Sequence, residues 1–466
     1  MDYAADFKRL RLGILLPMTG DWPIGRTVIG AVSLAVDDVN NDPGLLPGRK
    51  LEYAPVRDDA CNKLKALESL STIFDVDGPI DFVIGPGCSG GCISTATLSQ
   101  AKGLAQISPF CGSGALSNKK EYPVFMRTTS PYSKWGGALL ALMGWANWGS
   151  VALLRDQSEL MALSAQTMRS KLEEHAKQVV VEVRYISQGD LPSMLQRIEH
   201  AGARVVMALA YSTDYLAIAV AAKMLTFTEG WAWIGVDMVA DADTIGEAFG
   251  NVVTRQDAQA ALQGWIYMEP YSDAPASFFD RVRKASIEVH GQKLGENDPV
   301  NSFASNLYDA ILLYAHIVTS YPELVEKGPS DQAEKLMNFS FQGLGGGVIQ
   351  LDQDGDKKES IRVLNYGRRK DGRIGGRQVG VYDAIKVEYM PDNATEVLWP
   401  GHSSVFPLDK RGSEKVSTQM QLIIAGVLAG VLVIMFVIAA AFLLKNKKRG
   451  NGDPALSTSF VVPDHK

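Results

Sequence analysis

Short apolar runs alternate with helical patterns through most of the chain before residue 387, and this alternation constrains the fold more than any other feature. Runs that are apolar at consecutive positions predict strands buried on both faces, as in parallel sheets covered by helices. The predicted strands are RLGILLP from residue 11, KLEYAPV (50–56), DFVIG (81–85), AQISPF (105–110), SVALL (150–154), VVVEVRYI (179–186), RVVMALAY (204–211) and WAWIGV (231–236). The sequence therefore predicts an α/β fold with parallel sheets.

The series divides into two predicted lobes. Residues 9–130 form the first, completed by about 270–345, and residues 131–268 form the second, completed by about 346–386. Residues 387–420 lose the periodicity and gain Pro, Gly and Ser, which is typical of a stalk. Two lobes joined by several crossings create a cleft, and open α/β sheets bind ligands beyond the carboxyl ends of their strands.

Residues 421–444 are predicted to be a transmembrane helix, because the run from Leu422 to Leu444 holds 23 residues without a charge. A bilayer core of about 30 Å needs about 20 apolar residues. The basic cluster KNKKR follows at once, which places the tail, residues 445–466, in the cytoplasm. We expect the preceding part of the chain to lie outside the cell, at the plasma membrane.

This topology requires an N-terminal signal, which the sequence does not show. Its first apolar run is only a few residues long, ends at Pro17 and is better read as a strand. We expect that the protein has a signal peptide that this sequence does not include. The alternative is that the single span itself inserts into the membrane as an anchor near the tail.

The cysteines indicate an oxidising compartment. They are four in number and fall within one 51-residue window, which predicts two disulfides among Cys61, Cys88, Cys92 and Cys111. Zinc binding is the alternative, but the chain has no paired histidine motif. The sequons at Asn338 and Asn393 predict N-glycosylation of a secreted face.

Several function classes are disfavoured. The net charge of −6 argues against a nucleic-acid partner. No nucleophile elbow or histidine triad is present, so we expect no enzyme activity. The glycines of GPGCSGG fit a dinucleotide fingerprint, but the loop follows the third strand and no acid ends the next one, so no cofactor is expected. DQDGD (352–356) is read as a hairpin turn, not as a metal site.

Ser89 lies where the helix after this glycine loop is predicted to begin. Its hydroxyl and the first helical amides would favour a small anion such as a carboxylate. The alternative is that Ser89 only caps its helix.

Several motifs, in order, resemble one receptor superfamily: LGILLPMTGDWPIG, DDVNNDPGLLPGRKLEY, VRDDAC, GPGCSGG and SPFCGSGALSNKKEYPVFMRTT. The chain is similar to the receptor ligand-binding region, a two-lobed type I periplasmic-binding-protein clamshell. The resemblance includes natriuretic-peptide and guanylate-cyclase receptors and is greatest to type B γ-aminobutyric-acid receptor ectodomains. It runs from about Leu12 to Asp237, with a weaker echo at 307–315 and 346–356.

The resemblance implies a set of ligand-binding residues. Trp22 matches the aromatic residue that lines the cleft, and Ser89 matches the serine that holds the ligand carboxylate. Gly112 and Ser113 occupy the next loop, where a hydroxyl binds the same group. Tyr211 matches the second-lobe tyrosine that closes on the ligand.

The resemblance also implies a disulfide between Cys61 and Cys88, which leaves Cys92 and Cys111 for the second bridge.

The chain departs from the γ-aminobutyric-acid site at three places. Thr129 stands where that site has a histidine, Phe303 stands where it has the amine-binding glutamate, and Val236 replaces a tryptophan. Asp237 lies where α-amino-acid receptors of the superfamily keep an aspartate for the amine; a cap role for Asp237 is the alternative.

Together these features predict a single-pass membrane receptor that binds an amino acid or a derivative and signals by lobe closure. We expect a homo- or heterodimer. The alternatives are the truncated ectodomain of a receptor guanylate cyclase and a membrane-tethered solute-binding protein.

Overall fold

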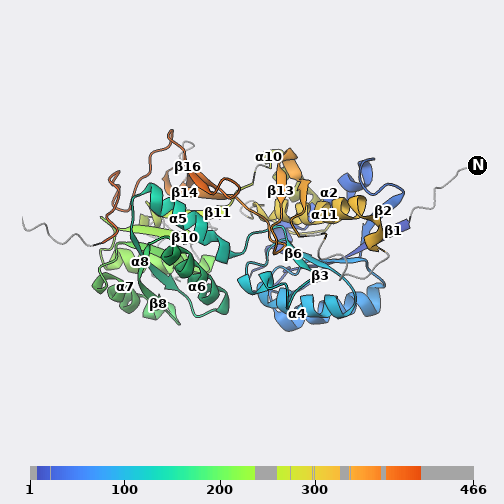
Figure 1. The fold of residues 1–466 in the computed structure, drawn as a ribbon, viewed down its shortest axis with the longest axis horizontal. Coiled ribbons are helices and arrows are strands. Elements are labelled where there is room, and N and C mark those ends of the chain that lie inside the picture. Colours follow the sequence, from blue (N-terminus) through green and yellow to red (C-terminus); the bar gives the residue numbers. More distant parts are fainter. Residues whose placement is uncertain are drawn as a thin grey trace, which may run out of the picture. The chain divides into compact units, whose positions relative to one another are not determined.

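The structure is a computed structural model that describes residues 8–410, apart from residues 21, 237–259, 273, 296–297, 299, 326–334, 336 and 369–373. The chain divides into two compact units, Met1–Lys410 and Arg411–Lys466, and all described residues belong to the first. This unit contains two large β-sheets with helices packed on them (Figure 1).

The first sheet is parallel, in the order β2-β1-β4-β5-β6, and the short β3 also pairs with β1. Leu12, Ile14 and Leu16 of β1 enter one core cluster, whereas Leu15 enters another. Successive side chains of a strand point to opposite faces, so a strand buried on both faces is apolar throughout. The strands are β1 (Lys8–Leu16), β2 (Arg49–Tyr53), β3 (Arg57–Asp58), β4 (Phe82–Ile84), β5 (Gln106–Ser108) and β6 (Phe125–Arg127).

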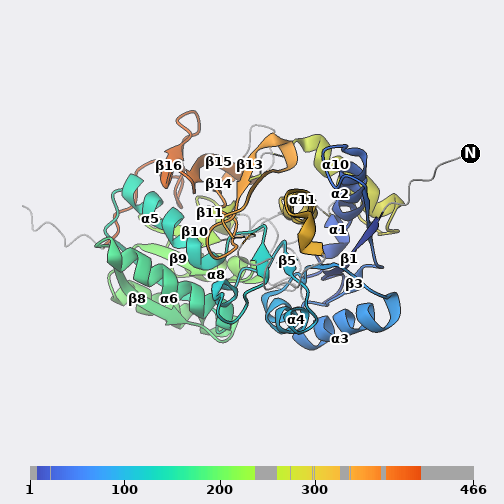
Figure 2. The ribbon, with the colours of Figure 1, turned by 45° about the vertical axis from the view of Figure 1, so that its right-hand side comes forward.

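Helices from distant parts of the sequence cover this sheet, with α3 and α4 on one face and α2, α10 and α11 on the other (Figure 2). Every residue of α11 from Phe303 to Ala315 is buried, because the helix packs between the sheet and its neighbours. The helices are α1 (Gly25–Val28), α2 (Gly30–Asn41), α3 (Lys63–Thr72), α4 (Ser89–Ala101), α10 (Ala276–Glu288) and α11 (Phe303–Ser320). Short turns are η1 (Ile73–Asp77), η2 (Gly114–Ser117), η7 (Pro322–Val325) and η8 (Leu344–Gly346).

The second sheet has the order β16-β15-β14-β11-β10-β9-β7-β8. Strands β7 to β11 are parallel, and β14, β15 and β16 add an antiparallel edge. The strands are β7 (Ser150–Arg155), β8 (Gln178–Arg184), β9 (Val205–Leu209), β10 (Ala232–Val236), β11 (Ile266–Pro270), β14 (Ile361–Arg368), β15 (Ile374–Asp383) and β16 (Glu388–Pro391).

Each face of the second sheet also has its own core. Leu142 of α5 and Met168 of α6 pack on one face, and Leu195 of α7 and Ile218 of α8 pack on the other. The helical elements are η3 (Tyr132–Trp135), α5 (Gly136–Trp145), α6 (Glu159–Glu174), η4 (Gln188–Asp190), α7 (Leu191–His200) and α8 (Ser212–Met224). The prediction of an α/β fold with parallel sheets is thus confirmed.

The observed division differs from the predicted one near residue 346, where the second lobe was expected to resume. Strands β12 (Ser340–Gln342) and β13 (Val348–Gln350) form a hairpin. Its side chains Ile349 and Leu351 enter the core of the first sheet, and Asp356 bridges to Arg127 at the end of β6. Burial of these apolar groups therefore holds the hairpin to the first sheet.

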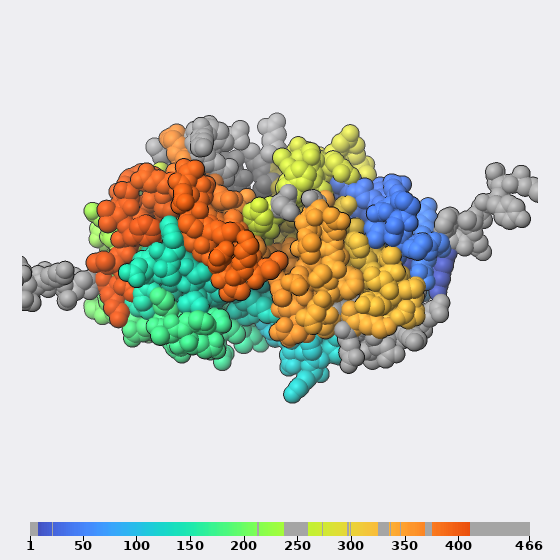
Figure 3. All heavy atoms as spheres, turned by 45° about the horizontal axis from the view of Figure 1, so that its top comes forward, coloured from blue at the N-terminus to red at the C-terminus, as the bar shows by residue number. Residues whose placement is uncertain are grey.

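The predicted stalk is wrong for residues 387–410. Strand β16 pairs with β15, and the buried Trp399 packs edge-on against Trp148. The indole N–H of Trp148 donates to the carbonyl of Pro407 at 2.7 Å. In Figure 3, the atoms of this last described segment, in orange-red, lie beside those of α5, in teal. Large buried aromatic side chains stabilise this segment against the second sheet despite its irregular sequence.

No helix within the described ranges is long and apolar enough to span a membrane. The predicted span at residues 421–444 and the tail at 445–466 lie outside those ranges.

Candidate functional site

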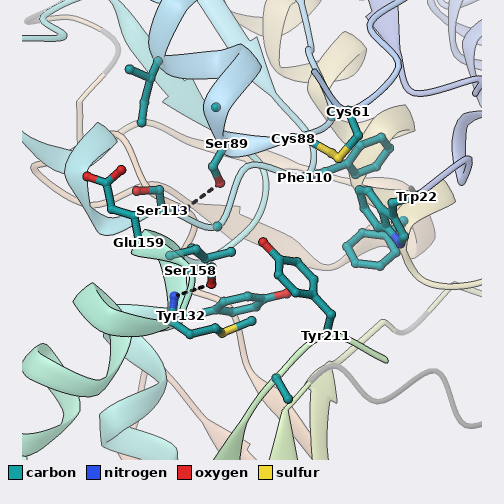
Figure 4. A pocket seen from close by; sticks show the side chains of 18 residues that line it. Trp22, Cys61, Cys88, Ser89, Phe110, Ser113, Tyr132, Ser158, Glu159 and Tyr211 are labelled. Carbon is teal, nitrogen blue, oxygen red and sulfur yellow. Dashed lines mark hydrogen bonds between the residues drawn. A yellow bond between two sulfur atoms is a disulfide. The ribbon is translucent and has the colours of Figure 1, made fainter. Parts of the chain in front are cut away.

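A pocket of about 330 Å³ lies where loops from both sheets meet (Figure 4). Most of its lining residues lie in the loops after parallel strands or in the first turns of the helices that follow, the position at which α/β sheets bind ligands. Those from the first sheet and its helices are Trp22, Cys61, Gly87, Cys88, Ser89, Gly90, Ile93, Phe110, Gly112, Ser113 and Phe303. Those from the second sheet and its helices are Tyr132, Ser158, Glu159, Leu160, Met161, Ala210 and Tyr211.

Five of the six predicted ligand-binding residues line this pocket: Trp22, Ser89, Gly112, Ser113 and Tyr211. The sixth, Asp237, lies outside the described residues. Thr129 is buried away from the pocket, where its hydroxyl contacts Glu359 at 3.3 Å.

Ser89 is the first residue of α4, and Cys88 occupies the cap position with no side-chain cap hydrogen bond. The oxygen of the Ser89 hydroxyl accepts from the backbone N–H of Ser113 at 3.1 Å. The first amides of a helix have no partner within the helix and favour negative charge. The site therefore joins a serine hydroxyl to a helix N-terminus, and the hydroxyl is not used as the helix cap.

Arg127 supports the loop that carries Gly112 and Ser113 by hydrogen bonds to its backbone carbonyls. This guanidinium is fully buried and donates to the carbonyls of Cys111 at 2.7 Å and Ser113 at 2.8 Å. It also forms a salt bridge of 2.6 Å with Asp356. Sequence reasoning did not identify Arg127, because nothing in a lone arginine after a strand signals that it is buried.

Lys134 occupies the acidic turn that was predicted to bind no metal. The carboxylate oxygens of Asp352, Asp354 and Asp356 lie within 4.8 Å of one another. The ammonium of Lys134 contacts all three, with Nζ 2.7 Å from Asp356. Burial alone would raise the pKa of Asp356, but Arg127 and Lys134 outweigh it and lower this pKa to about 2. A lysine ammonium thus offsets part of the negative charge of the turn.

An aromatic cluster forms the apolar wall of the pocket. The ring centroid of Trp22 lies 5.8 Å from that of Phe110 and 5.2 Å from that of Phe303, both edge-to-face. Phe110 and Phe303 are themselves 5.4 Å apart. Because Phe303 contributes to this packed wall, its position offers no charge to a ligand amine.

The second-sheet side of the pocket carries several polar side chains. Tyr211 precedes α8 and is half exposed. Its partial burial and the Asp156 carboxylate raise the pKa of Tyr211, and a hydrogen bond with Ser158 acts in the other direction. Sequence reasoning missed Ser158 and Glu159, although their place just after β7 could have indicated them.

Asp59 lies under the glycine loop and is fully buried. Its carboxylate accepts from the backbone N–H groups of Gly87 and Cys61, each at 2.8 Å. Burial outweighs these hydrogen bonds and raises the pKa of Asp59 to about 6. One side chain therefore connects the two backbone segments that the first disulfide also joins.

Both predicted disulfides are confirmed. Cys61 is bonded to Cys88 and Cys92 to Cys111, and Cys61 and Cys88 line the pocket. The predicted glycosylation sites Asn338 and Asn393 are both exposed, and their modification stays a prediction.

Comparison with known proteins agrees with this architecture. The family model of the receptor family ligand binding region matches residues 28–369. Guanylate cyclase 32E of Drosophila melanogaster is 21% identical over 371 residues, which cover 77% of this chain and 31% of the relative. Subunit 1 of the mouse (Mus musculus) γ-aminobutyric acid type B receptor is 25% identical over 400 residues, with 80% and 40% covered.

A third relative is similar over more of its own length. Human atrial natriuretic peptide receptor 3 is 24% identical over 379 residues, with 77% of this chain and 68% of the relative covered. The chain thus spans between about a third and two fifths of the first two relatives. Because the family match extends over most of the chain, including parts of both sheets, this protein belongs to the family of the receptor ligand-binding region.

Proposed function

We propose that this protein is a single-pass membrane receptor that binds an extracellular amino acid, or a close derivative, in the pocket between its two sheets. The observation that carries the proposal is that Ser89, at the start of α4, lines the same pocket as Tyr211 from the second sheet. A ligand bound there would touch both sheets at once.

Closure of the two sheets on the ligand would supply the signal. A ligand shifts a conformational equilibrium only by its different affinity for the two states. Trp22 and Ser89 would capture the ligand in the open state, and Tyr211 and Asp237 would engage it on closure. Relatives named as receptors support such a role, and we propose that the chain acts as a homo- or heterodimer.

A relative named as a guanylate cyclase favours one other candidate. On that proposal the chain is the ectodomain of a receptor cyclase whose catalytic part follows in a longer protein. A transcript that continues past Lys466 into a cyclase sequence would support this alternative over the first.

The ligand proposal is tested by thermal shift of the purified full chain in detergent, with the standard α-amino acids and γ-aminobutyric acid as probes. A probe at a hundredfold excess over its Kd should stabilise the wild type by about 2.7 kcal/mol. Ser89→Ala should abolish the shift. Ser94→Ala is the matched control, because Ser94 lies on the same helix outside the pocket lining. A lack of any shift in the wild type, or an equal shift in Ser89→Ala, would contradict the proposal.

Membrane topology is tested separately by expression in a secretory host. We expect the chain to enter the detergent phase on phase separation and to lose mass on deglycosylation, with Asn338→Gln and Asn393→Gln each removing one glycan. Unglycosylated protein in the aqueous phase would refute the proposed location.

A further inference from the structure

The two sides of the pocket differ in whether their hydroxyl groups have a proton left to donate. On the first-sheet side, the Ser89 oxygen accepts from Ser113. Among the described residues no acceptor takes the Ser89 hydroxyl proton. A serine hydroxyl carries one proton and two acceptor positions, so Ser89 is able to donate into the pocket, as a carboxylate requires.

On the second-sheet side the hydroxyl proton is already committed. Ser158 donates it to Oδ1 of the buried Asp156 at 2.6 Å, and the Ser158 N–H donates to the same oxygen at 2.8 Å. The oxygen of Ser158 can therefore only accept, and it already accepts from the N–H of Met161 at 3.3 Å. A hydroxyl oxygen has two acceptor positions, so Ser158 keeps one of them for a ligand.

Among the described residues that line the pocket, Glu159 on the second-sheet side is the one charged side chain, and none of them is a lysine or an arginine. It begins α6, directly after Ser158. Its carboxylate has no salt-bridge partner within the described part of the chain, and its side chain is exposed.

The local field on this side is negative. The N-terminus of α6 contributes about half a positive charge, whereas the carboxylates of Asp156 and Glu159 contribute two negative charges. A ligand with only a carboxylate would meet this field without a compensating cation. A ligand that also carries an ammonium would be attracted to it.

We propose that Glu159, with the acceptor oxygen of Ser158, forms an ammonium subsite that selects zwitterions over simple carboxylic acids. The inference rests on the proposed function and names its ligand class and orientation: the carboxylate contacts Ser89, and the ammonium contacts the N-terminal turn of α6. Asp156 acts as a positioning residue, because its carboxylate sets the direction of the Ser158 hydroxyl.

The test measures affinity of the full chain for paired probes by isothermal titration. Each α-amino acid, and γ-aminobutyric acid, is paired with the acid that lacks its amine. Glu159→Gln should weaken binding of the amino acid about tenfold, the effect of losing one charge-assisted hydrogen bond at a partly exposed site. It should leave the deaminated acid unchanged or bound more tightly. Glu174→Gln, at the exposed far end of α6, should change neither affinity.

The outcomes separate the two proposals. If no probe binds the wild type, both the proposed function and the ammonium subsite are wrong. If an amino acid binds and Ser89→Ala weakens it while Glu159→Gln does not, the function stands and the ammonium subsite is overturned. If the wild type binds the deaminated acid as tightly as the amino acid, the selectivity for zwitterions is overturned as well.

Discussion

Replacement of Asp356 by asparagine should destabilise the first sheet and the ligand loop above it. The Asp356 carboxylate is fully buried and lies 2.6 Å from Arg127, 2.7 Å from Lys134 and 2.8 Å from the Ser117 hydroxyl. Asparagine keeps the size of the side chain and one acceptor oxygen but removes the charge. The buried Arg127 guanidinium, which hydrogen-bonds the carbonyl of Ser113, then has no counter-charge in direct contact.

Removing one partner of a buried ion pair costs about 3–5 kcal/mol, because the other charge stays buried without compensation. We expect a loss near the lower end, about 3 kcal/mol, since asparagine can still accept a hydrogen bond from Arg127. Asp354→Asn is the matched control. Asp354 lies in the same turn and also contacts Lys134, but at 3.3 Å and with a side chain that is 33% exposed. A pair of this kind contributes at most about 1 kcal/mol.

The assay is urea unfolding of both variants and the wild type, followed by tryptophan fluorescence at pH 7. The midpoint should fall clearly for Asp356→Asn and little for Asp354→Asn. Equal midpoints for the two variants would refute the argument, because burial of the charge would then have no energetic consequence.

The same residue predicts a pH dependence of stability. The folded-state pKa of Asp356 is lowered from 3.8 to about 2. At about 1.4 kcal/mol per tenfold change in proton affinity, this corresponds to about 2 kcal/mol. The unfolded state binds more protons between these values, so the stabilisation is present above about pH 4 and is lost as the pH falls toward 2. The difference between wild type and Asp356→Asn should therefore shrink in that window.

Three further predictions concern the glycine loop and its supports. A Cβ at Gly85 would lie 2.0 Å from a backbone oxygen of β1, whereas at Gly48 it would meet nothing, and both have positive φ (+95° and +71°). Gly85→Ala should therefore cost well over the about 1 kcal/mol expected for Gly48→Ala, and equal costs in urea unfolding would contradict the clash. Replacing Cys92 and Cys111 by serine should cost about 3 kcal/mol, because the bridge closes a loop with a sequence separation of 19; an unchanged unfolding midpoint would exclude this contribution. The pKa of Asp59 is raised from 3.8 to about 6, so its ionisation should remove up to about 3 kcal/mol of stability as the pH rises from about 4 to about 6, a slope that Asp59→Asn should lack.

The fold could be predicted where strands are buried on both faces. Runs such as VALL (151–154) and VVMAL (205–209) are apolar at every position because helices cover both sides of the sheet. Strand β15 was not predicted, because its sequence IGGRQVGVYD mixes glycines and an arginine on the antiparallel side of the sheet. The sequence pattern also could not predict which sheet the segments after residue 340 would join. Periodicity shows that a segment is buried, but it does not show which other segment it packs against.

Site residues could be predicted from the sequence where they lie at or just after the carboxyl end of a predicted strand. Tyr211 ends the predicted strand RVVMALAY and Ser89 lies four residues after the predicted strand DFVIG, and the family resemblance assigned them to one cleft. Glu159 follows β7 in the same way and could have been identified by the same rule. Arg127 and Asp356 could not, because they are far apart in the sequence and their salt bridge exists only in the folded chain.

Whether a serine hydroxyl can donate a hydrogen bond to a ligand or only accept one cannot be predicted from the sequence; it has to be read from the structure. Ser89 and Ser158 are the same residue type, and each lies at the start of a helix that follows a parallel strand. They differ because Ser89 accepts from a backbone N–H, whereas Ser158 donates to a buried carboxylate. Ser89 can therefore donate a hydrogen bond to a ligand, whereas Ser158 can only accept one, although the two side chains are identical. A specificity for zwitterions therefore depends on Asp156, a residue outside the pocket lining, as much as on the side chains that would touch the ligand.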